Sequence, residues 1–278
     1  MEETVERVMP DADWVMDKDN HLHIRKPKGR RYKVGVFTSD LHGKHHYKVT
    51  SPVVYADMVN KASYDAVFMR YPYLYGAGYD RKVFYNRLQM SKYFLPWSVD
   101  TERFKPLEKT YDVGFIGAIG DCYPIRQQVW DNLYYVARGY KVYRNMAPKG
   151  KTFERQWSKL KDTHLVGDDY AKRLGETRIM IFDCSYYLYP IQKLTQTTSA
   201  GCLMMCNQPS MGKKLGFIPW KTYVEIDEHT WEDTLLYFLE NPKEGGLVAK
   251  QGMEMTRERH SHEVRAAQFI SLLEKELD

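Results

Sequence analysis

The sequence is poor in cysteine, and its cysteines form no paired motif. The 278 residues include four of them, with no C-x-x-C pair and no even spacing: Cys122, Cys184, Cys202 and Cys206. Disulfide frameworks and structural zinc sites depend on such spacings, so neither is expected here. The four thiols are predicted to be reduced and buried.

Long hydrophobic runs are also missing. No stretch reaches the roughly 18 consecutive apolar residues that a transmembrane helix needs. Residues 1–6 are acidic, where a secretory signal peptide would be basic and then apolar. The sequence therefore predicts a cytoplasmic protein with no transmembrane segment.

Neither sign of charge dominates the chain. Lys and Arg number 41 against 36 Asp and Glu, a net charge of +5, so any site for phosphate or nucleic acid must be local. Apolar residues make up 43% of the chain and aromatic residues 14%, which is enough for a packed core and argues against disorder. The length suggests two domains or one large domain.

Common nucleotide and metal motifs are absent as well. The sequence contains no G-x-G-x-x-G dinucleotide fingerprint and no G-x-x-x-x-G-K-[ST] phosphate loop. Asp168 and Asp169 are adjacent, while Asp17 and Asp19 fall in a polar N-terminal arm, so neither pair is taken as a D-x-D metal motif. No metal site is predicted.

What the sequence does contain is an alternation of β-rich runs and helix-compatible segments, which predicts an α/β fold with parallel sheets. Residues 1–32 are expected to form an irregular arm or a small hairpin. The predicted strands are 33–38, 65–69, 93–96, 111–116, 140–144, 163–166, 178–182, 202–206 and 223–226. The predicted helices are 52–61, 125–138, 153–161, 169–175, 193–200, 230–240 and an amphipathic C-terminal helix through 266–277.

Two prolines bracket a polar turn at residues 97–105, and this turn has the character of an interdomain linker. The chain is accordingly divided into a short N-terminal domain, residues 1–105, and a second domain, residues 106–258. A C-terminal helix, residues 259–278, is expected to pack across both.

Two loops at strand ends could approach a phosphate. Gly117 and Gly120 follow the strand 111–116, and Arg126 lies near the start of the next helix. Glycines and a helix N-terminus suit an anion, although a plain tight turn explains this G-x-x-G more readily. Lys193 begins a predicted helix near the carboxyl end of the strand 178–182, a place where parallel sheets bind ligands. It could contact a phosphate there, and the alternative is an ordinary lysine on a solvated helix face.

A third loop follows the strand 33–38 and is rich in histidine. Asp40 and His42 lie two residues apart there, and either could act as a base or bond a hydroxyl group. With His45 and His46 this loop could also bind a metal ion, although the spacing fits no firm ligand pattern. A surface loop with no chemical role is the remaining alternative.

Four sequence stretches, taken together and in this order, are far more specific than any one of them alone. Residues 94–106 read F-L-P-W-S-V-D-T-E-R-F-K-P, and residues 111–117 read Y-D-V-G-F-I-G. Residues 190–202 read P-I-Q-K-L-T-Q-T-T-S-A-G-C, and residues 260–266 read H-S-H-E-V-R-A. Together they resemble nucleotide-sugar glycosyltransferases of the GT-B fold, of the group-1 type with a spore-maturation-like carboxyl domain. That resemblance implies two Rossmann-like domains facing a cleft, the first of them short.

The resemblance also implies which residues hold the donor. It places a diphosphate loop at Gly117 and Gly120, with Arg126 and Lys193 as phosphate cations, and it places the base near Val166 and Gly167. Further along the chain it puts the donor ribose at Gln196 and the start of a helix beneath the diphosphate at Thr197 and Thr198. By analogy Asp40 and His42 face the reacting sugar or hydroxyl, and together with Lys193 they form the predicted catalytic set.

Two positions depart from the family pattern. Gln196 replaces the expected Glu, and Leu188, eight positions earlier, stands where the first Glu of the retaining-enzyme pair would be. A neutral amide still bonds a hydroxyl but accepts less strongly than a carboxylate. The affinity for the donor or the choice of donor is expected to differ accordingly.

The implied function is transfer of a sugar from a nucleoside diphosphate sugar, UDP- or GDP-linked, to a hydroxyl of a glycan or another acceptor. No metal ion or other cofactor is expected, because helix N–H groups, Lys193 and Arg126 would stabilise the leaving diphosphate. One alternative is transfer to a modified base in DNA, with the basic arm at residues 25–31 as the nucleic-acid contact. The other is a non-catalytic module that binds a nucleotide sugar.

Overall fold

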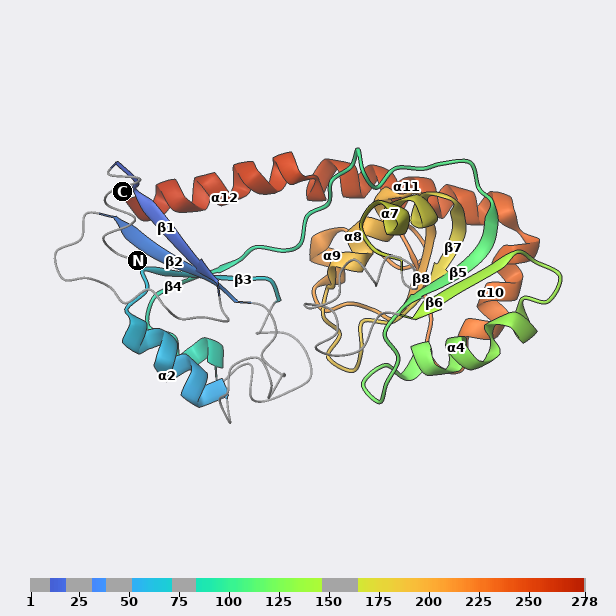
Figure 1. Cartoon of the computed structure of the whole chain (residues 1–278), viewed down its shortest axis with the longest axis horizontal. Helices are drawn as coiled ribbons and strands as arrows, with labels where there is room; N and C mark the ends of the chain where they lie inside the picture. The colour runs from blue at the N-terminus through green and yellow to red at the C-terminus, as the bar shows by residue number, and fades with distance from the viewer. Residues whose placement is uncertain (1–10, 19–31, 39–51, 72–83, 147–164, 278) are drawn as a thin grey trace. The chain divides into compact units, whose positions relative to one another are not determined.

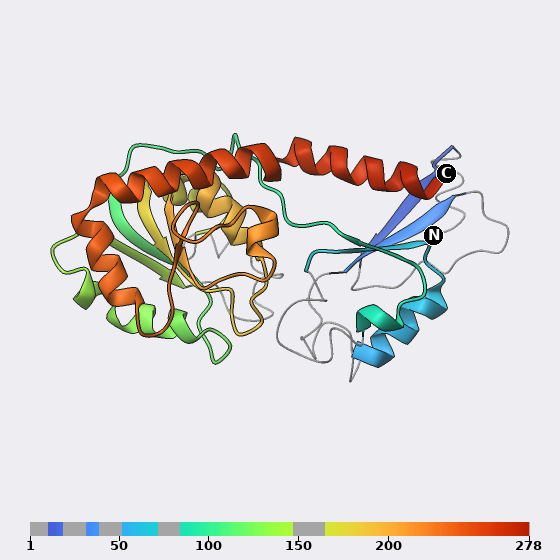
Figure 2. The ribbon, with the colours of Figure 1, turned by 180° about the vertical axis from the view of Figure 1, so that it is seen from behind.

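The computed structural model describes residues 11–18, 32–38, 52–71, 84–146 and 165–277. The chain divides into two compact units. The first comprises Met1–Pro96 together with Ala267–Asp278, and the second comprises Trp97–Ala266 (Figures 1 and 2). Each unit is built on a sheet of its own.

The first unit contains a four-stranded parallel sheet in the order β1-β2-β3-β4. Its strands are β1 (Trp14–Lys18), β2 (Lys33–Thr38), β3 (Ala66–Met69) and β4 (Ser91–Phe94). Helix α2 (Pro52–Ala62) lies on one face, and the end of α12 (His262–Leu277) lies on the other (Figure 1). Strand β3 is a continuous apolar run, and every one of its residues is buried. This is typical of a parallel strand that is covered by helices on both faces.

Aromatic rings fix the end of α12 to this sheet. The ring of Phe269 packs 5.4 Å from that of Phe37 and 5.0 Å from that of Phe68, measured between centroids. Tyr93 stacks on Phe68 at 5.5 Å, and its hydroxyl donates to the Glu276 carboxylate. The last turns of α12 therefore contribute to the core of the unit built on β1–β4.

The second unit contains a five-stranded parallel sheet in the order β6-β5-β7-β8-β9. Its strands are β5 (Tyr111–Gly117), β6 (Val142–Met146), β7 (Thr177–Ile181), β8 (Leu203–Cys206) and β9 (Val224–Glu225). Its helices are α4 (Pro124–Val136), α7 (Gly167–Gly175), α8 (Gln192–Ser199), α9 (Gly212–Leu215), α10 (Trp231–Glu240) and α11 (Pro242–His260). The order of strands reverses between β5 and β7, and ligands of open parallel sheets bind at such a switch point.

Helices cover both faces of this second sheet (Figure 1). Helices α4 and α10 pack against one face, around a core that includes Val129, Leu133 and Leu235. Helices α8 and α11 lie side by side on the other face. The starts of α4 and α8 thus come close to the ends of β5 and β7, where the predicted donor residues lie.

The predicted α/β class with parallel sheets is confirmed, and most predicted strands lie within two residues of the observed bounds. The expected arm or hairpin is wrong at residues 14–18, which form β1 parallel to β2. Asp17 of β1 is buried there, and its carboxylate accepts a 2.6 Å hydrogen bond from the Tyr64 hydroxyl. Asp17 interrupts the apolar pattern by which a buried strand is predicted. Its partner Tyr64 follows α2, 47 residues later, so the sequence around Asp17 does not show that the carboxylate is paired.

Three other predictions can be compared with the structure. Helix α11 is not among the predicted helices, although it is the longest one described. Cys184, Cys202 and Cys206 are free and buried as expected, but Cys122 is only half-buried. The predicted helix 153–161 lies outside the described residues, as does the first half of the predicted strand 163–166. The prediction is wrong for Leu165 and Val166, which are described and do not form a strand. The predicted domain limits at residues 105 and 258 stay a prediction.

Candidate functional site

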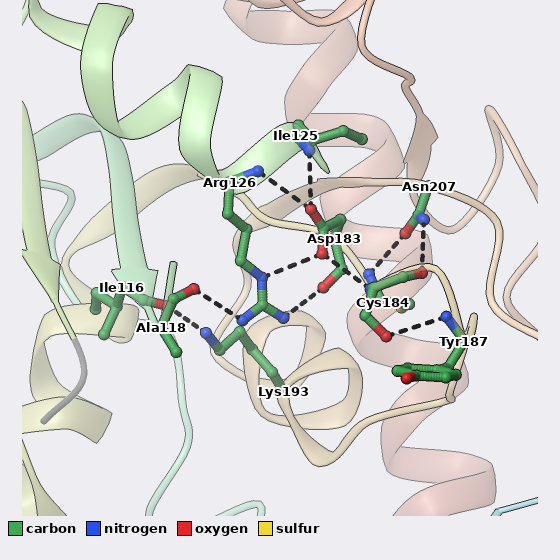
Figure 3. Close-up of polar contacts among 10 residues, drawn as sticks. Ile116, Ala118, Ile125, Arg126, Asp183, Cys184, Tyr187, Lys193 and Asn207 are labelled. Carbon is green, nitrogen blue, oxygen red and sulfur yellow. Dashed lines mark hydrogen bonds and ion pairs between the residues drawn. The ribbon is translucent and has the colours of Figure 1, made fainter. Parts of the chain in front are cut away.

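Lys193 lies at the end of β5, held by a backbone carbonyl. It is the second residue of α8, and its Nζ donates to the carbonyl oxygen of Ile116 (Figure 3). Gly117 makes room for it, since a Cβ at that position would stand 2.8 Å from Nζ. Burial and the positive charge of Arg126 hold the pKa of Lys193 well below its usual range, although Asp183 and Cys184 partly oppose this shift. A negatively charged ligand at this place would oppose that shift and favour the protonated form of Lys193.

Arg126 is buried, and its guanidinium is paired within the protein itself. Only 4% of it is exposed, and its guanidinium lies 3.8 Å from the centre of the Tyr123 ring. Its Nε is 3.3 Å from the Asp183 carboxylate, and its Nη1 donates to the carbonyl oxygen of Ala118 at 3.3 Å (Figure 3). The predicted phosphate cation Arg126 therefore lies beneath the loop 117–120, paired with a carboxylate.

That carboxylate, Asp183, is not among the predicted site residues. It is completely buried just after β7, and its Oδ2 accepts the backbone N–H groups of Ile125 and Arg126, each at 3.1 Å. Its Oδ1 accepts the N–H of Ser185 at 2.9 Å. The signal in the sequence was a single acidic residue directly after an apolar strand, which is where parallel sheets place polar site residues.

A cavity of about 220 Å³ opens between the linker and the starts of α7 and α8. Gly167, Tyr170, Gln192 and Gln196 contribute to its wall. The Tyr170 hydroxyl donates to Gln196 Oε1 at 3.3 Å, so the amide of Gln196 is oriented within the wall. The structure thereby brings together two predicted residues, Gln196 and Gly167, that lie almost thirty positions apart.

The remaining predicted residues are distributed around α7 and α8. Val166 is the extended residue that precedes α7. Thr198 is buried against α11, where its hydroxyl meets that of Thr256 at 2.6 Å and also donates to Leu194. Thr197 is completely buried, and its hydroxyl has no hydrogen-bond partner among the described residues. Asp40 and His42 lie outside the described residues.

The loop that leads to α8 has an unusual backbone. Ser185 and Leu188 both adopt left-handed conformations, with φ of 62° and 52°. The N–H of Leu188 donates to Ser185 at 3.1 Å, and its carbonyl accepts from Ser210 at 2.7 Å, so the conformation is held from both sides. Such conformations cost energy and gather near functional sites, which fits the position of this loop beside Lys193.

The sequence of this second unit matches a known family. A family model described as glycosyl transferase-like matches residues 130–271, about half of the chain. The chain belongs to this glycosyl transferase-like family. A search of curated proteins finds no match to its sequence.

Several solved structures share the fold of this glycosyl transferase-like protein. Sucrose-phosphate synthase from Thermosynechococcus elongatus superposes with a TM-score of 0.63 at 12% identity, over 98% of this chain and 76% of that chain. HepE from Anabaena, in complex with UDP-glucose, has a TM-score of 0.62 at 10% identity, over 88% of this chain and 73% of that chain. A glycosyltransferase from Rickettsia africae has a TM-score of 0.61 at 10% identity, over 99% and 79%.

The predicted GT-B glycosyltransferase of the group-1 type is confirmed at the level of family and fold. In the parts of the chain that the structure describes, no helix is both long and apolar enough to cross a membrane. Over the same residues, no group of three or more His, Cys, Asp and Glu side chains is arranged to hold a metal ion.

Proposed function

We propose that this glycosyl transferase-like protein moves a sugar from a nucleoside diphosphate sugar to a hydroxyl acceptor without a metal ion. The observation that carries the proposal is the placement of Lys193 at the start of α8, beside the switch point of the sheet. Two sources of positive potential coincide there, namely an ammonium group and the N-terminus of a helix. The structural neighbour HepE is described in complex with UDP-glucose, which supports a donor of this chemical class.

In this mechanism the leaving diphosphate gathers negative charge as the bond to the sugar breaks. The ammonium group of Lys193 and the backbone N–H groups at the start of α8 stabilise that charge. Burial lowers the pKa of Lys193, and the negative charge of the diphosphate would oppose this shift and favour the protonated lysine. Asp40 and His42 stay the predicted groups on the acceptor side.

We place the nucleoside in the cavity beside Gln196. The amide of Gln196 can bond a ribose hydroxyl. Gly167 lines the cavity, and Val166 precedes it in the chain, so we expect the base to lie near these two residues. The cavity of about 220 Å³ is small for a whole nucleotide sugar, which fits a nucleoside that occupies only one end of the site. A uracil or guanine base, as in UDP or GDP, is the expected occupant.

A non-catalytic nucleotide-sugar-binding module is the second candidate. Gln196 and Leu188 supply no carboxylate where the related enzymes have glutamates, which favours this reading. The third candidate, transfer to a base in DNA, depends on basic residues 25–31, which lie outside the described residues. Nothing in the described residues favours that acceptor.

Two measurements on Lys193→Ala test the proposal. A thermal-shift panel of UDP, GDP, ADP, TDP and CMP sugars should give one class that raises the melting temperature of the wild type. A ligand at 100 times its dissociation constant adds about 2.7 kcal/mol of stability. Lys193→Ala should reduce this shift and should lower donor turnover by roughly 10- to 1,000-fold.

Lys250→Ala serves as the control, because Lys250 is an exposed lysine of α11 that pairs with Glu254, with 67% of its side chain accessible. It should behave like the wild type in both measurements. Unchanged turnover in Lys193→Ala would reject the assigned role of Lys193. Donor binding by the wild type without any hydrolysis or transfer would favour the non-catalytic module.

A further inference from the structure

The starts of α4 and α8 differ in how their backbone N–H groups are used. At α4, Pro124 has no N–H, and those of Ile125 and Arg126 donate to Asp183. At α8, no described residue accepts a hydrogen bond from the N–H of Gln192 or Lys193, and no side chain caps the helix. The helix end nearest the loop 117–120 is therefore closed, while that of α8 is open.

Arg126 is closed off in the same way. Asp183 neutralises its guanidinium, and both side chains are at least nine-tenths buried. A donor phosphate that bound Arg126 directly would have to displace this carboxylate, and it would leave Asp183 as an unpaired charge in the interior. Removing one partner of a buried ion pair is strongly unfavourable, so such displacement is disfavoured.

A chain of contacts joins this pair to Lys193. Arg126 donates to the carbonyl oxygen of Ala118, and Lys193 donates to that of Ile116 (Figure 3). Both cations therefore bond the backbone of the segment 116–118. Gly117 lies between them, with its missing Cβ 2.8 Å from Lys193 Nζ and 3.5 Å from Arg126 Nη1. A shift of Arg126 would therefore move the backbone to which Lys193 is bonded.

We propose that Asp183 is a positioning residue of the donor site. It holds Arg126 beneath the loop 117–120 and closes the start of α4, so that the donor diphosphate contacts Lys193 and the open start of α8 and not Arg126. This inference rests on the proposed function for the identity of the ligand. The placement of Lys193 by the buried pair can be tested without any ligand.

The ligand-free test follows the protonation of Lys193. Its rate of acylation by an amine-reactive reagent is measured against pH by mass spectrometry, in the wild type, Asp183→Asn and Arg126→Gln. Asp183 raises and Arg126 lowers the pKa of Lys193, so the half-point should move to lower pH in Asp183→Asn and to higher pH in Arg126→Gln. Half-points that do not move, or that move in the same direction, would overturn the proposal.

The double variant Asp183→Asn, Arg126→Gln guards against simple loss of folding. It removes both charges together and leaves no unpaired ion in the interior, so it should melt closer to the wild type than either single variant does. Its half-point for Lys193 should fall between those of the two single variants. A double variant that is the least stable of the three would contradict a mutually compensating pair.

Binding of UDP decides whether Arg126 touches the diphosphate. Lys193→Ala should weaken binding by about tenfold or more, while the double variant should lose several-fold less, because it alters only the support of the site. Equal losses in the two would overturn the proposal, since Arg126 would then contact the ligand. If UDP and GDP bind to none of the proteins, the proposed function fails, and the acylation result still judges the role of Asp183.

Discussion

Single residues decide how closely charged groups meet in the second unit. Gly117 is the clearest case, because the space that its side chain would fill is occupied by the ammonium group of Lys193. Asp183 shows the converse, since one carboxylate accepts two N–H groups of a helix and forms an ion pair with a buried guanidinium. Such groups are costly to bury unless every one of them is paired.

Gly117→Ala should impair the site without unfolding the protein. Its methyl group would push against Lys193 Nζ at 2.8 Å, so the lysine would leave the end of β5. We expect a loss of UDP affinity of about tenfold, as for removal of one charged hydrogen bond, measured by titration calorimetry. In a Lys193→Ala background the same substitution should add little, and an equally large effect there would show that the methyl group acts elsewhere.

At the scale of elements, the second unit depends on how closely α11 approaches its neighbours. A Cβ at Gly252 would stand 2.4 Å from the backbone carbonyl oxygen of Thr222, so the helix and the segment before β9 touch through backbone atoms. The same helix meets α8 through the hydroxyls of Thr198 and Thr256. Small residues allow this contact, and they also weaken the helix signal in the sequence.

Gly252→Ala should therefore destabilise the protein although alanine favours helices. Backbone cannot give way as a flexible side chain does, so we expect a loss of about 1 to 3 kcal/mol in the free energy of unfolding. Gly246→Ala is the matched control on the same helix, since nothing lies within 4 Å of a Cβ there. Urea unfolding of both variants is the measurement, and a Gly252→Ala midpoint at or above that of Gly246→Ala would contradict the close contact.

For the molecule as a whole, one buried histidine links folding to pH. His260 is 3% exposed, and its Nε2 bonds the carbonyl oxygen of Leu215 at 2.7 Å while its Nδ1 accepts from Arg265 at 2.9 Å. Its ring also stacks on Phe217. Burial lowers the pKa of His260 to about 4, so the folded protein holds this ring neutral.

Because this pKa is lower in the folded than in the unfolded state, the stabilisation is complete above pH ~6.5 and is lost as the pH falls toward 4. The loss through this one group should reach about 3 kcal/mol. Melting temperatures from pH 7.5 to 4.5 should fall less steeply in His260→Gln than in the wild type. His229→Gln, at an exposed position, should keep the wild-type slope, and a parallel slope in His260→Gln would exclude this linkage.

Much of the fold could be predicted because local pattern and tertiary structure agree there. The runs 66–69 and 203–206 are apolar throughout, and both are strands buried on two faces. Helix α4 begins with a proline, and α7 carries acidic residues in its first turn and basic residues in its last, so their limits were close to those expected. Strand β1 and helix α11 were not predicted. The polar Asp17 of β1 and the small Gly252 of α11 suit their elements only because each contacts a residue far away in the chain, Tyr64 and Thr222 respectively.

The α/β class, the parallel sheets and the family could be predicted from the sequence, since each depends on hydrophobic period or on ordered motifs. Lys193 was expected at the end of the strand 178–182, but its ammonium group donates to Ile116 in β5. The partners of the buried charged groups could be known only from the folded structure. In the structure Arg126 is buried against Asp183, and the Thr198 hydroxyl bonds that of Thr256 in α11. Gln196 and Gly167 line the same cavity. Pairing of buried charges depends on distances between segments far apart in the chain, and no local pattern encodes those distances.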